Sequence, residues 1–202
     1  MKTIIYIIIY IIIYCILIQC VNKNRYIDVD EKFQQSVYGP GKEFYTKDST
    51  YVLQQNMKNY YKETIIKKNS PYTIYRKYEI QTKKYMGGGK DFYGCSIGMW
   101  KEYDTKGNIV KKINYDEHFP FSIKKLAKKM AKEYNIDIMN PYYVRFLSRG
   151  VDNNGMASYT LGLYCTAEDS EEDVTLIIDG KTGEIKSRTK CKEVDHVGKD
   201  YY

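Results

Sequence analysis

The sequence predicts an α+β protein, in which an antiparallel strand-rich unit is followed by one amphipathic helix packed on an antiparallel β-meander. Two observations support this fold class. Apolar and polar residues alternate between residues 72 and 115 and again between 142 and 189, which is the pattern of half-buried strands. Between these stretches, residues 122–134 place apolar side chains at helical spacing. We expect two units, at 51–117 and 118–191, and the sequence leaves open whether they share one core.

Residues 1–19 have the features of a secretory signal peptide. A single positive charge, Lys2, precedes an apolar run from Ile4 to Ile18, and the run stops abruptly at Gln19. A run of about 15 residues is shorter than the roughly 20 that a spanning helix needs, so export is favoured over a permanent membrane span.

The run ends in Leu-Ile-Gln-Cys at residues 17–20, which resembles the lipobox of bacterial lipoproteins. The resemblance implies that Cys20 is lipidated and becomes the first residue of the mature chain, although Gln19 replaces the small residue that the family prefers. We therefore expect a palmitate-type membrane anchor in the cell envelope, facing the periplasm or the exterior, with simple secretion or an uncleaved anchor as alternatives. Residues 20–50 show no sustained period and are interpreted as the lipidated tether.

Export would allow a disulfide between two of the three cysteines that follow Cys20, namely Cys95, Cys165 and Cys191. An oxidising compartment permits one disulfide among three pairings. We prefer Cys165–Cys191, because both residues end predicted strands. The alternative is three buried thiols that pack as small hydrophobic groups.

In the first unit, residues 72–82 alternate as a strand with one apolar face and one largely polar face. Gly87-Gly88-Gly89 is expected to break the chain in a flexible turn. Residues 96–104 and 108–115 flank Thr105-Lys106-Gly107, so a hairpin is predicted there.

This hairpin carries Gly-Met-Trp-Lys-Glu-Tyr-Asp-Thr-Lys-Gly-Asn-Ile at residues 98–109, which resembles a degenerate MORN unit. In that family each unit is a β-hairpin with glycine at the turn, and its aromatic residues pack on the next hairpin. Only one clear copy is visible, and a single hairpin cannot bury its own face. We therefore expect residues 72–115 to form one small antiparallel sheet and not a repeat array.

The second unit begins with the predicted helix. Ser122 suits the N-cap, Phe121 and Leu126 occupy the two hydrophobic-staple positions, and Asn135 suits the end of the helix. The apolar face is opposed by a face of lysines, namely Lys124, Lys125, Lys128, Lys129 and Lys132.

Four strands are predicted after the helix, at 142–147, 158–165, 174–179 and 184–189. The last hairpin contains Ile-Ile-Asp-Gly-Lys-Thr-Gly-Glu-Ile at residues 177–185, and residues 119–190 resemble the PepSY-like α+β modules of exported bacterial proteins. The chain as a whole resembles uncharacterised exported lipoproteins of Gram-negative bacteria, a resemblance that implies no activity. Residues 192–202 are expected to form a flexible tail.

Composition narrows the function classes. A mean hydropathy of −0.56 excludes a protein with many membrane spans. The net charge of +7 is modest, and 23 tyrosines in a chain also rich in Ile, Lys and Asn indicate compositional drift, so we predict no nucleic-acid partner. Two histidines leave little material for metal or acid–base chemistry, and we expect neither a metal site nor a cofactor.

Several motifs contain residue types found in functional sites, but each lacks part of the pattern that such a site needs. Gly87-Gly88-Gly89-Lys90 lacks the P-loop spacing. His118 and His196 stand beside carboxylates, but no nucleophile motif accompanies them. Cys191, Asp195 and His196 do not have the spacing of a structural metal site. The acidic stretch 168–173 lacks the EF-hand spacing, so a solvated loop is the better interpretation.

These observations predict a non-enzymatic, lipid-anchored envelope protein that acts as a binding module for a protein or ligand. The first alternative is an immunity or inhibitor-type lipoprotein that neutralises a toxic partner, and the second is an envelope hydrolase that uses His118. The binding surface is predicted from two groups of side chains, an aromatic pair on the hairpin and the lysine face of the helix: Trp100, Tyr103, Lys124, Lys125, Lys128 and Lys129.

Overall fold

The computed structural model describes residues 41–164 and 173–191, and these residues form two antiparallel sheets. The larger sheet contains seven strands in chain order: β1 (Lys42–Tyr45), β2 (Thr50–Asn56), β3 (Tyr61–Lys67), β4 (Tyr72–Tyr78), β5 (Tyr85–Phe92), β6 (Cys95–Tyr103) and β7 (Ile109–Asn114). The smaller sheet has the order β11-β10-β9-β8, with β8 (Val144–Val151), β9 (Ala157–Leu163), β10 (Asp173–Asp179) and β11 (Ile185–Cys191). The helices within these described ranges are α3 (Ile123–Tyr134) and the short 3-10 helix η1 (Pro141–Tyr143).

The expected α+β class is wrong, because the described residues are nearly all-β, with eleven strands and one α-helix of 12 residues. The first sheet begins at Lys42, inside the segment expected to be a tether. Strand β2 buries Val52, Gln54 and Asn56 on one face. Two of these three side chains are polar, so hydropathy does not reveal the strand period there.

The chain break expected at Gly87-Gly88-Gly89 is also wrong, because all three glycines lie inside β5, which pairs with β4 and β6. Gly89 is required by a close approach. A Cβ atom at this position would lie 2.1 Å from the indole carbons of Trp100. Glycine inside a strand often marks such a contact, and here it lets the indole lie across the β5 backbone.

The locally encoded elements are confirmed. Strands β6 and β7 form the predicted hairpin, in which the Gly107 N–H donates to the Asp104 carbonyl at 3.0 Å. At the start of α3, the Ser122 hydroxyl accepts a hydrogen bond from the Lys125 N–H, and at its end Asn135 adopts the left-handed conformation with φ 56°. In the last hairpin, the Asp179 carboxylate accepts from two backbone N–H groups of the turn, and these bonds lower the pKa of Asp179.

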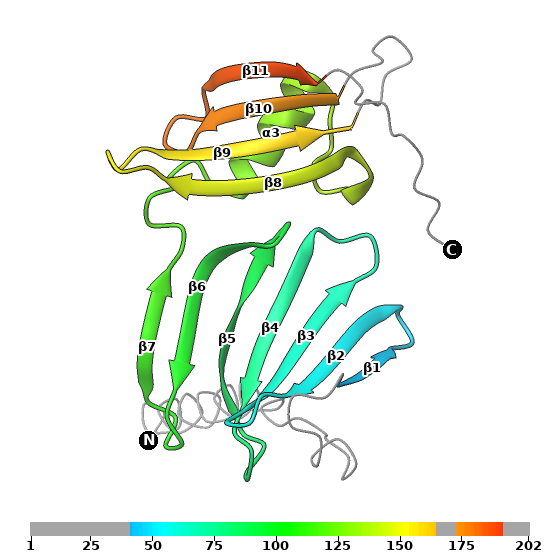
Figure 1. Cartoon of the computed structure of the whole chain (residues 1–202), viewed down its shortest axis with the longest axis vertical. Coiled ribbons are helices and arrows are strands. Elements are labelled where there is room, and N and C mark those ends of the chain that lie inside the picture. Colours follow the sequence, from blue (N-terminus) through cyan, green and yellow to red (C-terminus); the bar gives the residue numbers. More distant parts are fainter. Residues whose placement is uncertain (1–40, 165–172, 192–202) are drawn as a thin grey trace, which may run out of the picture.

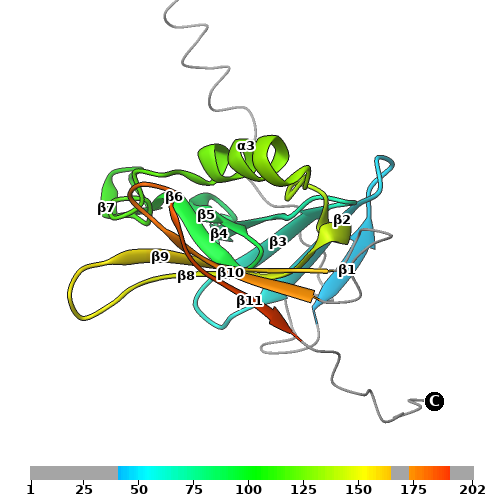
Figure 2. The same ribbon diagram turned by 90° about the horizontal axis from the view of Figure 1, so that it is seen from above.

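Helix α3 covers one face of the four-stranded sheet, and this sheet lies across the end of the seven-stranded sheet (Figures 1 and 2). The two units share one core. Phe92, from β5 of the larger sheet, is fully buried in the same cluster as side chains from the helix and the smaller sheet, among them Leu126, Met130, Tyr159, Leu161, Leu176 and Ile178. The Tyr93 hydroxyl adds a hydrogen bond to the Ile138 carbonyl at 3.0 Å.

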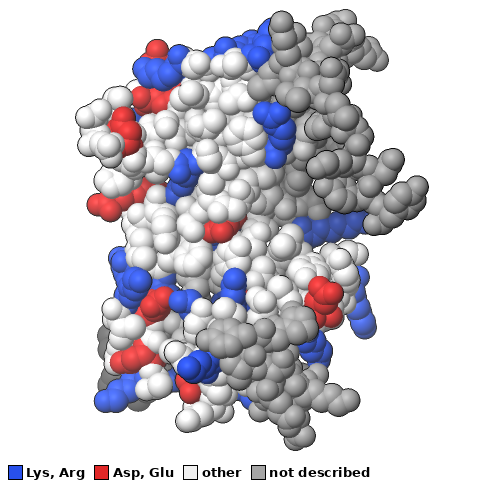
Figure 3. Space-filling view, viewed as in Figure 1, with Lys and Arg blue, Asp and Glu red and all other residues white. Residues whose placement is uncertain are grey.

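The opposite face of the four-stranded sheet, turned away from α3, carries few charges (Figure 3). Phe146 and Ile177 are among its exposed apolar residues.

No helix in the two described ranges is both long and apolar enough to span a membrane.

Candidate functional site

The seven-stranded sheet has two faces of different character. Because side chains alternate along a strand, Tyr75 and Lys77 of β4 point to one face, and Arg76 and Tyr78 point to the other. The first face also holds Trp100, whose ring packs against Tyr75. We name it the Trp100 face, and we name the opposite one the Arg76 face.

The Trp100 face contains a pocket of about 300 Å³, here called the Trp100 pocket. Its side chains come from β3, β4, β5 and β6 and from the turn before β3, so residues distant in sequence meet there. The lining includes Tyr60, Lys62, Tyr75, Lys77, Asp91 and Trp100.

The aromatic wall of the Trp100 pocket is held on several sides. The ring centroids of Trp100 and Tyr75 lie 5.9 Å apart, and Tyr115 meets the indole edge-on at 5.7 Å. Gly89 provides the surface beneath the indole. The indole Nε1–H is buried and finds no acceptor among the described residues. Rings fixed in this way offer contact area with little loss of side-chain entropy on binding.

Two lysines border these rings in different electrostatic settings. The Lys77 ammonium lies 5.2 Å from the Tyr60 ring centroid and 2.7 Å from Glu102 Oε1, and this ion pair lowers the pKa of Glu102. The Lys62 ammonium lies 4.9 Å from the Tyr75 ring centroid. Within the described part of the chain, no carboxylate lies within 4.0 Å of it. Lys62 therefore brings to the pocket an ammonium that has no ion-pair partner among the described residues.

The third charged group of the Trp100 pocket is the buried carboxylate of Asp91. Asp91 is only 7% exposed and accepts a hydrogen bond from the Ser96 hydroxyl at 2.9 Å. Burial and this nearby carboxylate together raise the pKa of Tyr75, so its phenol stays protonated at neutral pH. The pocket thus combines aromatic walls, neutral hydroxyl groups, one buried carboxylate, one ion-paired lysine and one ammonium outside any ion pair.

The residues predicted as one binding surface lie in three places. Trp100 lies in the pocket, whereas Tyr103 lies on the Arg76 face and packs against Tyr85 with ring centroids 6.0 Å apart. The four lysines belong to α3 in the other unit, where Lys129 pairs with Glu133 at 2.6 Å. Lys125 donates to the Pro120 carbonyl at 3.0 Å, and Lys124 and Lys128 are exposed.

Sequence reasoning missed a buried polar network on the Arg76 face. Glu63 is 8% exposed and accepts hydrogen bonds from Gln54 at 3.2 Å and from the Tyr78 hydroxyl at 3.1 Å. Arg76 Nη1 lies 3.4 Å from the same carboxylate. Burial and the Glu63 charge raise the pKa of Tyr78. The alternation of strand β4 could have placed Arg76 and Tyr78 on one face, but no pattern in the sequence marks Glu63 as buried.

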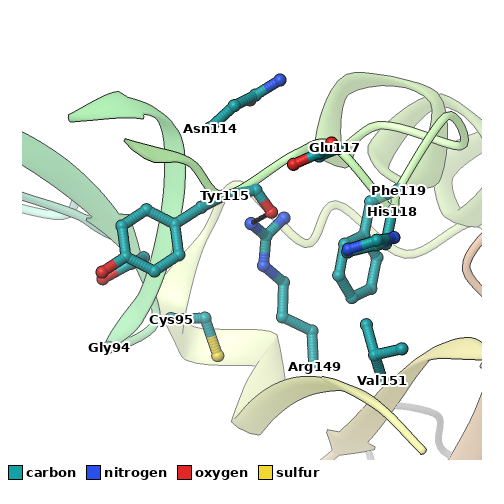
Figure 4. Close-up of a pocket in the computed structure, with 10 residues that line it drawn as sticks. Gly94, Cys95, Asn114, Tyr115, Glu117, His118, Phe119, Arg149 and Val151 are labelled. Carbon is teal, nitrogen blue, oxygen red and sulfur yellow. Dashed lines mark hydrogen bonds between the residues drawn. The ribbon is translucent and has the colours of Figure 1, made fainter. Parts of the chain in front are cut away.

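A larger pocket of about 500 Å³ lies at the junction of the two units and contains His118 (Figure 4). The Arg149 guanidinium occupies its centre. It donates to Asp116 Oδ1 at 2.8 Å and to the Tyr115 carbonyl at 2.5 Å, and it lies 4.4 Å from the Phe119 ring centroid. Arg149 comes from β8, so these contacts fasten the smaller sheet to the chain that leaves β7.

Two side chains near His118, Cys95 and Ser96, donate their hydrogen bonds to other residues. The Cys95 thiol donates to the Leu147 carbonyl at 3.2 Å, and burial raises its pKa, which disfavours the reactive thiolate. The Ser96 hydroxyl donates to Asp91. Figure 4 shows Cys95 and His118 on opposite sides of Arg149. The junction pocket is therefore organised as a clamp around Arg149.

Some predicted sites cannot be compared with the structure. Cys20, Cys165, His196 and the acidic stretch 168–172 lie outside the described residues, so lipidation and the Cys165–Cys191 disulfide stay predictions. Within the two described ranges, no three His, Cys, Asp or Glu residues are grouped so as to hold a metal ion.

Comparison with protein-family models, with curated proteins and with solved structures finds no match for this chain. The lipobox, MORN-like and PepSY-like resemblances therefore stay predictions. What the fold itself defines is an antiparallel β protein of two sheets with one shared core.

A change at Gly89 should disturb the Trp100 pocket from beneath. Gly89→Ala places a methyl group where the indole now lies, so we expect Trp100 to tilt away and the free energy of unfolding to fall by about 1–2 kcal/mol. Urea unfolding measures the loss, and the emission maximum of Trp100 reports its exposure. Gly150→Ala is the matched control, because no atom lies within 4 Å of a Cβ built there. Equal behaviour of the two variants would contradict the close contact.

Proposed function

We propose that this chain is a non-enzymatic binding protein of the cell envelope, attached to a membrane through a lipid on Cys20, and that it binds a protein partner at the Trp100 pocket. The observation that carries the proposal is the fixed aromatic wall of Trp100 and Tyr75 beside the unpaired Lys62 ammonium. Tryptophan and tyrosine in well-packed pockets dominate the binding energy of many protein interfaces.

The charges indicate what the partner presents. Lys77 is already neutralised by Glu102, whereas Lys62 has no acidic partner in the described residues. A partner side chain that combines an apolar group with a nearby carboxylate would pack on the indole and pair with Lys62. Complementary charge of this kind speeds association and fixes the register of the interface more than it adds affinity.

Lipid attachment would support such a role by holding the pocket at the membrane surface. Confinement raises the effective concentration of a partner in the same envelope, so a modest affinity suffices. The immunity-type alternative uses the same pocket and differs in the identity of the partner, which would be a toxic protein.

Site-specific photo-crosslinking in the producing cells tests the proposed pocket. A benzoylphenylalanine that replaces Tyr60 should give one discrete adduct, and Trp100→Ala should abolish that adduct. Benzoylphenylalanine at Tyr142, which is 79% exposed in the other unit, is the control and should give none. Adducts that are the same from both positions, or that survive Trp100→Ala, would count against the pocket.

The affinity for the crosslinked partner, once purified, gives the quantitative prediction. Trp100→Ala should weaken binding about thirtyfold, which corresponds to about 2 kcal/mol, because an aromatic anchor is removed. Trp100→Phe should retain most of the affinity. Intact mass of the protein from membranes tests the anchor separately, since it should show an acylated N-terminal cysteine.

A further inference from the structure

A second hollow lies on the Arg76 face, on the opposite side of the sheet from the Trp100 pocket. Across this face, Arg76 of β4 stands opposite Gly88 of β5, and Gly88 stands opposite Lys101 of β6. Because Gly88 has no side chain, the cross-strand row is interrupted. A cavity of about 470 Å³, here called the Gly88 pocket, lies beside this glycine.

The Gly88 pocket has apolar walls next to two cations. Ile74, Ile97, Met99 and Tyr85 supply the apolar surface. Lys90 stands opposite both Ile74 and Ile97 in the strand register, and its ammonium lies 4.9 Å from the Tyr72 ring centroid. Arg76 is the diagonal neighbour of Lys90, at the roughly 7–8 Å that separates such positions.

The acidic groups near the Gly88 pocket neutralise the charges of Arg76 and Lys90 only in part. Asp116, at its rim, pairs with Arg149 at 2.8 Å. Glu63 contacts Arg76 through one guanidinium nitrogen at 3.4 Å, and 42% of the Arg76 side chain is exposed. The Lys90 ammonium lies 4.9 Å from the Tyr72 ring centroid, and no carboxylate of the described residues lies within 4.0 Å of it.

The buried polar network prepares Arg76 for a ligand. Glu63 is held by Gln54 and Tyr78, so the contact between Glu63 and Arg76 restrains one end of the guanidinium. Arg76 also has a side-chain hydrogen bond with Tyr78. The N–H groups that are left on its 42% exposed side chain can donate to a carboxylate. Arg76 and Lys90 together therefore favour an anion that also carries an apolar body.

We propose that the Gly88 pocket binds a small amphiphilic carboxylate. Its headgroup lies between Lys90 and Arg76, and its apolar body packs on Ile74, Ile97 and Met99. This site is on the other face of the sheet from the Trp100 pocket, so either can exist without the other. Neutral analogues lose the charge-assisted hydrogen bonds, and cationic analogues are repelled.

Titration calorimetry on the full chain in phosphatidylcholine nanodiscs, with empty nanodiscs as the blank, tests the proposal. The probes share one ring system and differ in charge: 2-naphthoate, 2-naphthamide and 2-naphthylmethylammonium. We expect saturable binding of one 2-naphthoate per chain and at least about tenfold weaker binding of the other two. Equal binding of all three probes, or no saturable binding of 2-naphthoate, overturns the proposal.

Variants locate the binding. Lys90→Gln should weaken 2-naphthoate binding about tenfold and leave 2-naphthamide unchanged. Lys101→Gln is the matched control, because Lys101 lies on the same face outside the pocket lining and should change neither. Met99→Trp should fill the pocket from an exposed position and remove binding without unfolding the chain. Equal losses in Lys90→Gln and Lys101→Gln overturn the assignment. Trp100→Ala should leave 2-naphthoate binding intact, which separates this site from the proposed function.

Discussion

Phe92→Ala is expected to lower the free energy of unfolding by about 3–5 kcal/mol and to destabilise both sheets together. Phe92 is 0% exposed, and its ring contacts Tyr72 at 5.1 Å and Tyr93 at 4.8 Å between centroids. The same side chain belongs to the cluster that contains Leu126 of α3. Removing the ring therefore leaves a cavity between the two units, and the lost contacts belong to both.

Two probes follow the sheets separately during guanidinium unfolding of Phe92→Ala. Trp100 is the single tryptophan, so its fluorescence reports the seven-stranded sheet. Amide hydrogen exchange at Leu161 and Leu176 reports the four-stranded sheet. Phe44→Ala is the control, because Phe44 is 37% exposed on β1, and it should change stability by about 0.5 kcal/mol or less. A loss confined to one sheet would contradict a shared core.

Arg149→Met is expected to cost about 2–3 kcal/mol of stability. The Arg149 side chain is 6% exposed and makes hydrogen bonds to Asp116 and to the Tyr115 carbonyl. Methionine keeps part of the packing on Phe119 but loses both bonds. Asp116 is 39% exposed, so water can solvate its charge, and the cost stays below that of a fully buried orphan carboxylate.

A double-mutant cycle isolates the Arg149 ion pair. Urea unfolding of Arg149→Met, Asp116→Asn and the double variant should give a coupling energy of about 1 kcal/mol. Arg145→Met, at an exposed position of the same strand, should have a small effect. If Arg149→Met and Arg145→Met are equally stable, the junction is not fastened by this arginine.

Elements encoded by neighbouring residues could be predicted from the sequence. The α3 bounds follow from Ser122, Asn135 and the apolar spacing between them, and the β6–β7 hairpin follows from its turn. Strand β2 could not be predicted, because its buried positions include Gln54 and Asn56. The close contact that requires glycine at position 89 is made with Trp100, which is 11 positions away in the chain. The three consecutive glycines considered alone therefore indicate a turn.

In the candidate site, too, some residues could be predicted from the sequence and others could not. The sequence predicts Trp100 together with Tyr103 and the lysines of the helix, whereas Lys62 and Tyr75 join Trp100 only through strand pairing. Tyr103 could have been placed on the other face from its spacing alone, since two residues three apart in a strand point to opposite sides. The Gly88 pocket has no sequence signal, because its lining comes from β4, β5 and β6, which meet only through strand pairing.

The burial of Phe92 against α3 also determines where the polypeptide can be divided. Produced alone, residues 118–191 would expose to water the apolar surface that Phe92 and Ile97 now cover, and such a fragment should aggregate. Recombination that transplants the carboxy-terminal half into another protein would have to carry the ends of β4, β5 and β6 with it. A gene fusion at residue 117 would therefore divide a shared core and is a poor route to a new protein of this architecture.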